Sequence, residues 1–167
     1  MAVPRRTVGQ RAIVRRAIGR RAIGATLSGL AAVAGIWPDA LASPAQDYVL
    51  HCMGCHGATA EGVPGKVPPL ARSLVQFMRS PAGRSYVLRV PGASNSMLTD
   101  AQLAGVLNWI AARYGGTQDV TTAAMPPVFT LQEVSAQRRL PMAAVQATRR
   151  EVVRELAASG TAPSDNY

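Results

Sequence analysis

The stretch HCMGCH, residues 51–56, holds both cysteines and both histidines of this 167-residue chain. Four side chains that bind soft metal ions well therefore lie within six consecutive residues. The spacing within this stretch distinguishes between three possible roles, which are a disulfide, a metal site and the attachment of a covalent cofactor. The fold that we predict depends on which of these roles is correct.

The segment Cys52-Met53-Gly54-Cys55-His56 matches C-x-x-C-H, the attachment signature for c-type haem. Two thiols three positions apart on one helical turn can reach two vinyl groups on one porphyrin edge. The imidazole of the next residue can then bind the iron as the proximal ligand. The motif predicts one covalent haem c, attached through Cys52 and Cys55, with His56 on the iron.

Three other interpretations fit the six residues less well. A thioredoxin-like pair needs a βαβ context, and a structural zinc ion is bound by two separated couples of ligands. A disulfide between Cys52 and Cys55 would close a very small, strained ring. His51, on the attachment side of the ring, is expected at the surface or near the propionates and not on the iron.

Residues 1–42 are predicted to be a secretory signal peptide. Residues 1–21 contain seven arginines and no acid, residues 22–37 carry no charge, and Ala40-Leu41-Ala42 is a small-residue cleavage site. Cleavage after Ala42 and a periplasmic location are expected. The alternative is an uncleaved membrane anchor, although this apolar stretch is short and contains three glycines.

The charge of the remaining chain excludes a nucleic-acid-binding role. The whole chain has a net charge of +9, but residues 43–167 hold eleven basic and eight acidic residues, which gives +3. A basic patch of the kind that binds nucleic acid is therefore missing from the mature sequence. About 125 residues suit one domain with one modest core.

The mature chain is predicted to be all-α. Ser43 and Gln46 form a capping box before a first helix that leads into the cysteine motif, and a Gly- and Pro-rich loop covers residues 57–69. Residues 70–80 and 81–90 are expected to be helical, and residues 90–92 to form a turn. Thr99 caps a further helix, which ends at Gly115-Gly116 and has one apolar stripe at positions 103, 106, 107, 110 and 114.

Residues 43–116 resemble a class I cytochrome c. The resemblance rests on the short helix into Cys52-x-x-Cys55-His56, the loop at Pro68-Pro69-Leu70 and the terminal helix from Thr99 to Tyr114. It implies a cytochrome c-like haem domain whose activity is electron transfer. The segment from Val90-Pro91-Gly92 to Leu107-Asn108-Trp109 also resembles small bacterial periplasmic cytochromes, some of which accompany periplasmic dehydrogenases.

The class I pattern implies a methionine as the distal iron ligand. In that pattern the methionine precedes the last helix of the haem domain, a position that Met97 takes. Met125 is the alternative, and an open or weakly bound site is the third possibility. Met78 and Met142 lie in helical patterns, where methionine usually fills the core.

Residues 117–160 are expected to form a helical extension packed on or beside the haem domain, followed by a disordered tail at 161–167. A helix is expected to begin at Pro141 and run to Ala158. Its apolar face carries Val145, Val152, Val153 and Leu156, opposite arginines 149, 150 and 154. The haem domain is expected to have a core of its own by residue 116.

These observations predict a periplasmic single-haem electron carrier and not an enzyme. It would accept electrons from a periplasmic dehydrogenase and pass them to an oxidase or another cytochrome. The alternatives are a haem enzyme or gas sensor with an open distal site, or a cytochrome subunit of a larger dehydrogenase complex. Contact with a membrane is expected only if the signal peptide is uncleaved.

Overall fold

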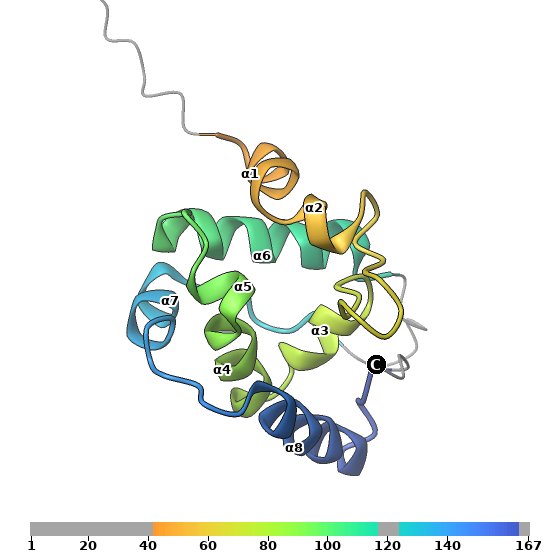
Figure 1. Cartoon of the computed structure of the whole chain (residues 1–167). Helices are drawn as coiled ribbons and strands as arrows, with labels where there is room; N and C mark the ends of the chain where they lie inside the picture. Colours follow the sequence, from red (N-terminus) through yellow and green to blue (C-terminus); the bar gives the residue numbers. More distant parts are fainter. Residues whose placement is uncertain (1–41, 117–123, 164–167) are drawn as a thin grey trace, which may run out of the picture. The chain divides into compact units, whose positions relative to one another are not determined.

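A computed structural model describes residues 42–116 and 124–163 of the chain (Figure 1). The predicted signal peptide, apart from Ala42, and residues 164–167 of the predicted tail lie outside the described residues. The secondary structure consists of α1 (Pro44–His51), α2 (Met53–His56), α3 (Ser73–Phe77), α4 (Pro81–Arg89), α5 (Pro91–Ser94), α6 (Asp100–Tyr114), α7 (Leu131–Gln137) and α8 (Val145–Ala158). The described residues contain no β-strand beyond one isolated bridge between Val63 and Val67, so the predicted all-α class is confirmed.

The two predicted capping boxes begin α1 and α6 as expected. The Ser43 hydroxyl accepts from the backbone N–H of Gln46 at 3.3 Å, and the Gln46 side chain accepts from the Ser43 N–H at 2.8 Å. Thr99 and Gln102 make the same exchange at 3.2 and 3.0 Å. Both helices therefore start with satisfied N–H groups, which fixes where each one begins.

Helix α6 packs directly against α1. Figure 1 shows α6 between α1 on one side and α3, α4 and α5 on the other. The Tyr48 ring of α1 lies 5.5 Å from the ring of Trp109 and 5.9 Å from that of Tyr114. A hydrogen bond of 3.2 Å from the Gln102 amide to the buried Asp47 carboxylate fixes the register of the two helices. Trp109 thus covers the helix–helix contact.

The middle of the chain differs in detail from the prediction. Residues 70–80 are helical only in the short α3, and the expected turn at residues 90–92 lies partly in the four-residue helix α5. Pro81 begins α4 as expected, with the Ser80 hydroxyl accepting from the Gly83 N–H at 3.0 Å. Short helices joined by tight turns leave room between α4 and α6.

Helix α8 begins at Val145, so the predicted start at Pro141 is wrong. The reason is a long-range contact, because the Arg89 guanidinium donates to the carbonyls of Leu140 (3.3 Å) and Pro141. Carbonyls that accept from Arg89 keep this segment outside the helix. The first backbone bond of α8 is instead the one from the Thr148 N–H to the Ala144 carbonyl at 2.9 Å.

Side chains after residue 116 belong to the same core as those before it. Phe129, Val134, Val152 and Leu156 are buried in one cluster with the residues of α3, α4 and α6. Arg84 of α4 ties the extension down through Glu133 (2.6 Å) and the Pro127 carbonyl (2.6 Å). The core of the haem domain is therefore shared with the extension, and its sufficiency by residue 116 stays a prediction. No helix in the described residues is both long and apolar enough to span a bilayer.

Candidate haem site

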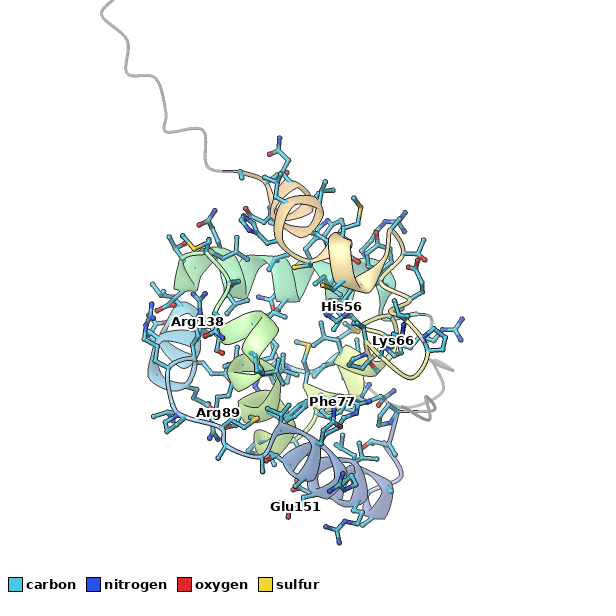
Figure 2. All side chains as sticks on the ribbon, viewed as in Figure 1. His56, Lys66, Phe77, Arg89, Arg138 and Glu151 are labelled. Carbon is cyan, nitrogen blue, oxygen red and sulfur yellow. The ribbon has the colours of Figure 1, made fainter. Side chains whose placement is uncertain are left out.

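His56 is the last residue of α2 and is directed into the molecule (Figure 2). Its Nδ1 lies 3.1 Å from the carbonyl oxygen of Pro68, twelve residues further along the chain. A ligand histidine commonly donates its second N–H to such a carbonyl, which fixes the tautomer and the ring orientation. The Pro68 carbonyl thus orients the ring of His56 and leaves Nε2 available to bind a metal.

The loop after α2 brings the Pro68 carbonyl to His56. The Gly62 N–H donates to the His56 carbonyl at 2.8 Å, which folds the loop back on the motif. The buried Ala60 carbonyl accepts from both Leu70 (2.8 Å) and Ala71 (2.9 Å). Gly62 has a φ of +69°, and a Cβ there would lie 2.4 Å from the Val67 carbonyl, so glycine is required at this position.

Burial favours the neutral form of two residues of the motif, His56 and Cys52. It lowers the pKa of His56, against an opposing contribution from the Pro68 hydrogen bond, and a neutral imidazole is the form that binds iron. Burial, with the nearby Asp47 charge, raises the pKa of the Cys52 thiol to about 11. Cys52 is half-buried and Cys55 exposed, and both are free thiols.

A cavity of about 300 Å³ opens beside the motif. This volume is at the lower end of the range for small-molecule sites, about 300–1,000 Å³. Its motif residues are His51, Cys52, Cys55 and His56. Most of the other residues that line it are apolar, among them Leu74, Val87, Val90, Leu98, Leu103, Val106, Leu107 and Ile110. The cavity therefore occupies space between the helices that apolar side chains would otherwise fill.

The residues present fit a covalently attached haem. Two free thiols and an imidazole with an available Nε2 lie at one cavity, and the remaining walls can contact an apolar macrocycle. Among the described residues, no three His, Cys, Asp or Glu side chains gather to hold a metal ion. The zinc interpretation therefore has no supporting geometry in the described part of the chain.

The extension also contributes to this site, which sequence reasoning missed. Val145, Gln146 and Arg149 of α8 line the cavity. Arg149 is only 6% exposed, and its guanidinium lies 5.1 Å from the centre of the Phe77 ring. The prediction that it belongs to the charged face of α8 is wrong. Helical spacing could have shown this, because position 149 is four residues after Val145 and three before Val152.

The structure does not bring the predicted distal methionine to the cavity. Met97 is 87% exposed and Met125 is 59% exposed. Met78 is buried in the core, but neither it nor Met97, Met125 or Met142 is among the residues that line the cavity. His51 is exposed and lines the cavity from the segment that carries the cysteines.

Two relatives that share sequence with this chain are both named cytochrome c-552. The first, from Thermus thermophilus, is 31% identical over 105 residues, a match that covers 52% of this chain and 78% of the relative. The second, from a particular strain of the same species, is also 31% identical over 105 residues, and 69% of its length is covered. No sequence model of a known protein family matches the chain.

Helical fold, cysteine motif and cavity together are those of a cytochrome c-like domain. At this identity, and with more than two thirds of each relative covered, the chain belongs to the c-type cytochrome family. Its fold is the all-α cytochrome c-like fold, and its core extends through α7 and α8.

Proposed function

We propose that this protein is a single-haem electron carrier with the fold of a class I cytochrome c. The observation that carries the proposal is the placement of Cys52, Cys55 and His56 at one apolar cavity, with His56 Nδ1 bonded to Pro68. Cys52 and Cys55 would attach the haem, and His56 would bind its iron through Nε2. The bound haem would supply a site that accepts and releases one electron.

The surroundings of the motif support electron exchange with another protein. Cys55 is exposed, so the attached edge of the macrocycle would lie close to solvent. Val49 and Leu50 on the preceding turns are 51% and 71% exposed, and exposed apolar side chains of this kind suit contact with a partner. The proposed donor is a periplasmic dehydrogenase, and the proposed acceptor is an oxidase or another cytochrome.

The proposed location is the periplasm, reached after removal of residues 1–42. The basic segment, the uncharged stretch and the small-residue site at Ala40-Leu41-Ala42 support this proposal. Mass analysis of protein from the periplasmic fraction should find Ser43 at the N-terminus. A chain that retains Trp37 and sediments with membranes would contradict it.

Haem attachment is tested by replacing both thiols. The variant Cys52→Ala/Cys55→Ala should carry no haem on a denaturing gel stained for peroxidase activity, whereas the unmutated chain should stain. His51→Ala is the matched control, since this exposed residue belongs to the same six residues but has no proposed bond to the haem. Haem that leaves the unmutated chain on denaturation would contradict the proposal.

Electron transfer is tested on the haem-loaded protein. Potentiometric titration should show one reversible one-electron transition, and a periplasmic dehydrogenase from the same host should reduce the protein. A haem-loaded protein that no partner reduces, and whose iron does not cycle reversibly, would contradict a carrier function.

A further inference from the structure

The segment between α5 and α6 borders the cavity but turns its methionine away from it. Ser96 and Leu98 both line the cavity. Met97 lies between them, and its side chain is 87% exposed. The residue that the class I pattern assigns to the iron therefore points to solvent while both of its neighbours face the cavity.

Arg138 holds this segment in place. It lies at the end of α7, is 2% exposed, and approaches the segment that enters α6 (Figure 2). Its Nε donates to the Ser94 carbonyl at 3.2 Å, and its Nη1 donates to the Leu98 carbonyl at 2.6 Å and to Asp100 at 2.9 Å. Its Nη2 donates to the carbonyl and the hydroxyl of Ser96 at 2.6 and 2.9 Å.

These contacts occupy the whole guanidinium group, which has five N–H donors. Four of the five bonds go to the backbone or side chain of residues 94–98. To bring the Met97 sulfur into the cavity, the peptides on either side of it would have to turn. That movement would break three of the five bonds, those to Ser96 and Leu98, and leave the buried cation with only Ser94 and Asp100 as partners, which is unfavourable.

The rest of the cavity offers no replacement ligand of the usual kind. No methionine is found among the residues described as lining it, and both histidines come from the segment that carries the cysteines. Lys66 lines the cavity from the loop that carries Pro68. Because Pro68 binds Nδ1 of His56, this loop meets the imidazole at Pro68 on the side away from Nε2.

The wall formed by α4, α5 and the following segment is largely apolar. Its residues include Val87, Val90, Ala93 and Leu98. The Ser96 hydroxyl donates to the Ala93 carbonyl at 3.0 Å and accepts from Arg138, so its proton is already engaged. This wall offers a ligand no charged partner, and the cations that line the cavity, Lys66 and Arg149, come from the loop before Pro68 and from α8 instead.

We propose that the haem iron has no second protein ligand and that its sixth position takes a small neutral diatomic molecule. Arg138 is the positioning residue that keeps Met97 away from that position. This proposal rests on the haem attachment proposed above. The peroxidase-stained gel tests haem attachment separately. A chain that carries no haem on that gel contradicts the proposed function, whereas the experiments below test this inference on the haem-loaded protein.

The first experiment uses the haem-loaded protein and Met97→Leu. The ferric protein should lack the band at about 695 nm that reports a methionine–iron bond, and the ferrous protein should bind carbon monoxide. Met97→Leu should leave both properties unchanged. A 695 nm band that is present in the unmutated protein and lost in Met97→Leu would overturn the proposal, as would a ferrous protein that does not bind carbon monoxide.

The second experiment releases the segment with Arg138→Lys. A lysine cannot make the five bonds of the guanidinium group, so Met97 should gain access to the iron. A 695 nm band should then appear and carbon monoxide affinity should fall, and both changes should disappear in Arg138→Lys/Met97→Leu. The exposed neighbour Arg139, changed to lysine, is the matched control.

If Arg138→Lys folds and has the same ferric spectrum and carbon monoxide affinity as the unmutated protein, the positioning role of Arg138 is overturned. If this variant does not fold, Asp100→Asn weakens the same cluster by removing the carboxylate partner of Arg138. Its spectrum should change in the same direction as that expected for Arg138→Lys. No change would contradict the positioning role.

Discussion

At the scale of single residues, Tyr48 links the first helix to the end of the cysteine motif. Its hydroxyl donates to the Gly57 carbonyl at 2.6 Å, one residue after His56. Burial, with a smaller contribution from Tyr114, raises the pKa of Tyr48 to about 12. The neutral phenol is therefore the form that the fold stabilises.

Tyr48→Phe should lower the free energy of unfolding by about 0.5–1.5 kcal/mol, because the half-buried Gly57 carbonyl loses the Tyr48 hydroxyl and keeps only the longer bond of 3.4 Å from the Ala60 N–H. The pH dependence has a definite sign. A pKa raised from 10 to about 12 in the folded state gives stability that is present below pH 10 and lost as the pH rises through 12. Between pH 9 and pH 11, urea unfolding should show a larger loss of unfolding free energy for the unmutated protein than for Tyr48→Phe. An equal loss in both would contradict this role.

At the scale of elements, the loop of residues 57–69 is the part that orients His56. Two of its glycines have similar backbone angles but different surroundings. Gly62 has a φ of +69° and a Cβ added to it would meet the Val67 carbonyl at 2.4 Å, whereas Gly65 has a φ of +70° and open space around it. Alanine variants of these two glycines therefore distinguish the cost of a left-handed backbone from the additional cost of steric crowding.

Gly65→Ala should cost about 1–2 kcal/mol through its left-handed backbone alone, whereas Gly62→Ala should cost more. The added methyl group in Gly62→Ala must displace the Val67 peptide, which precedes the carbonyl that orients His56. Thermal unfolding of both haem-loaded variants measures the difference, and the ferric spectrum should change only in Gly62→Ala. Equal stability of the two variants would contradict this account of the loop.

Local sequence signals predicted the elements that local interactions determine. The capping boxes at Ser43 and Thr99 and the apolar stripe of α6 depend on residues a few positions apart, so their helices were predicted well. The start of α8 depends on Arg89, some fifty residues earlier, and was predicted wrongly. The burial of Arg138 has no local signal, because its partners lie about forty residues away. The position of Met97 in the sequence predicts a place close to the haem site, but the direction of its side chain depends on the contacts that Arg138 makes.

At the scale of the whole molecule, the extension after residue 123 is part of the structure that forms the cavity. Arg138 holds the segment before α6, and Arg149 lines the cavity from α8. Val134 and Leu156 are almost fully buried in the shared core. The helices α7 and α8 therefore contribute to the shared core and to the cavity, and do more than add a surface for docking.

A chain ending at residue 128 should lose its cooperative thermal unfolding and attach little haem. Removal exposes the apolar surface of α4 and α6 that Phe129, Val134 and Leu156 cover, at about 25 cal/mol per Å². Circular dichroism and the peroxidase-stained gel measure the two effects. A chain ending at residue 163, which keeps Ala162 against the core, is the control and should behave as the full chain does. A folded, haem-loaded protein ending at residue 128 would show that residues 43–116 have a sufficient core.

The central claim is that this chain is a c-type cytochrome with one haem bound through its cysteine motif. Peptide mass analysis of the purified, denatured protein tests it most directly. We expect the peptide containing Cys52, Cys55 and His56 to carry the added mass of one haem, with no thiol left to alkylate. Recovery of that peptide at its unmodified mass, with both thiols alkylated, would contradict the claim.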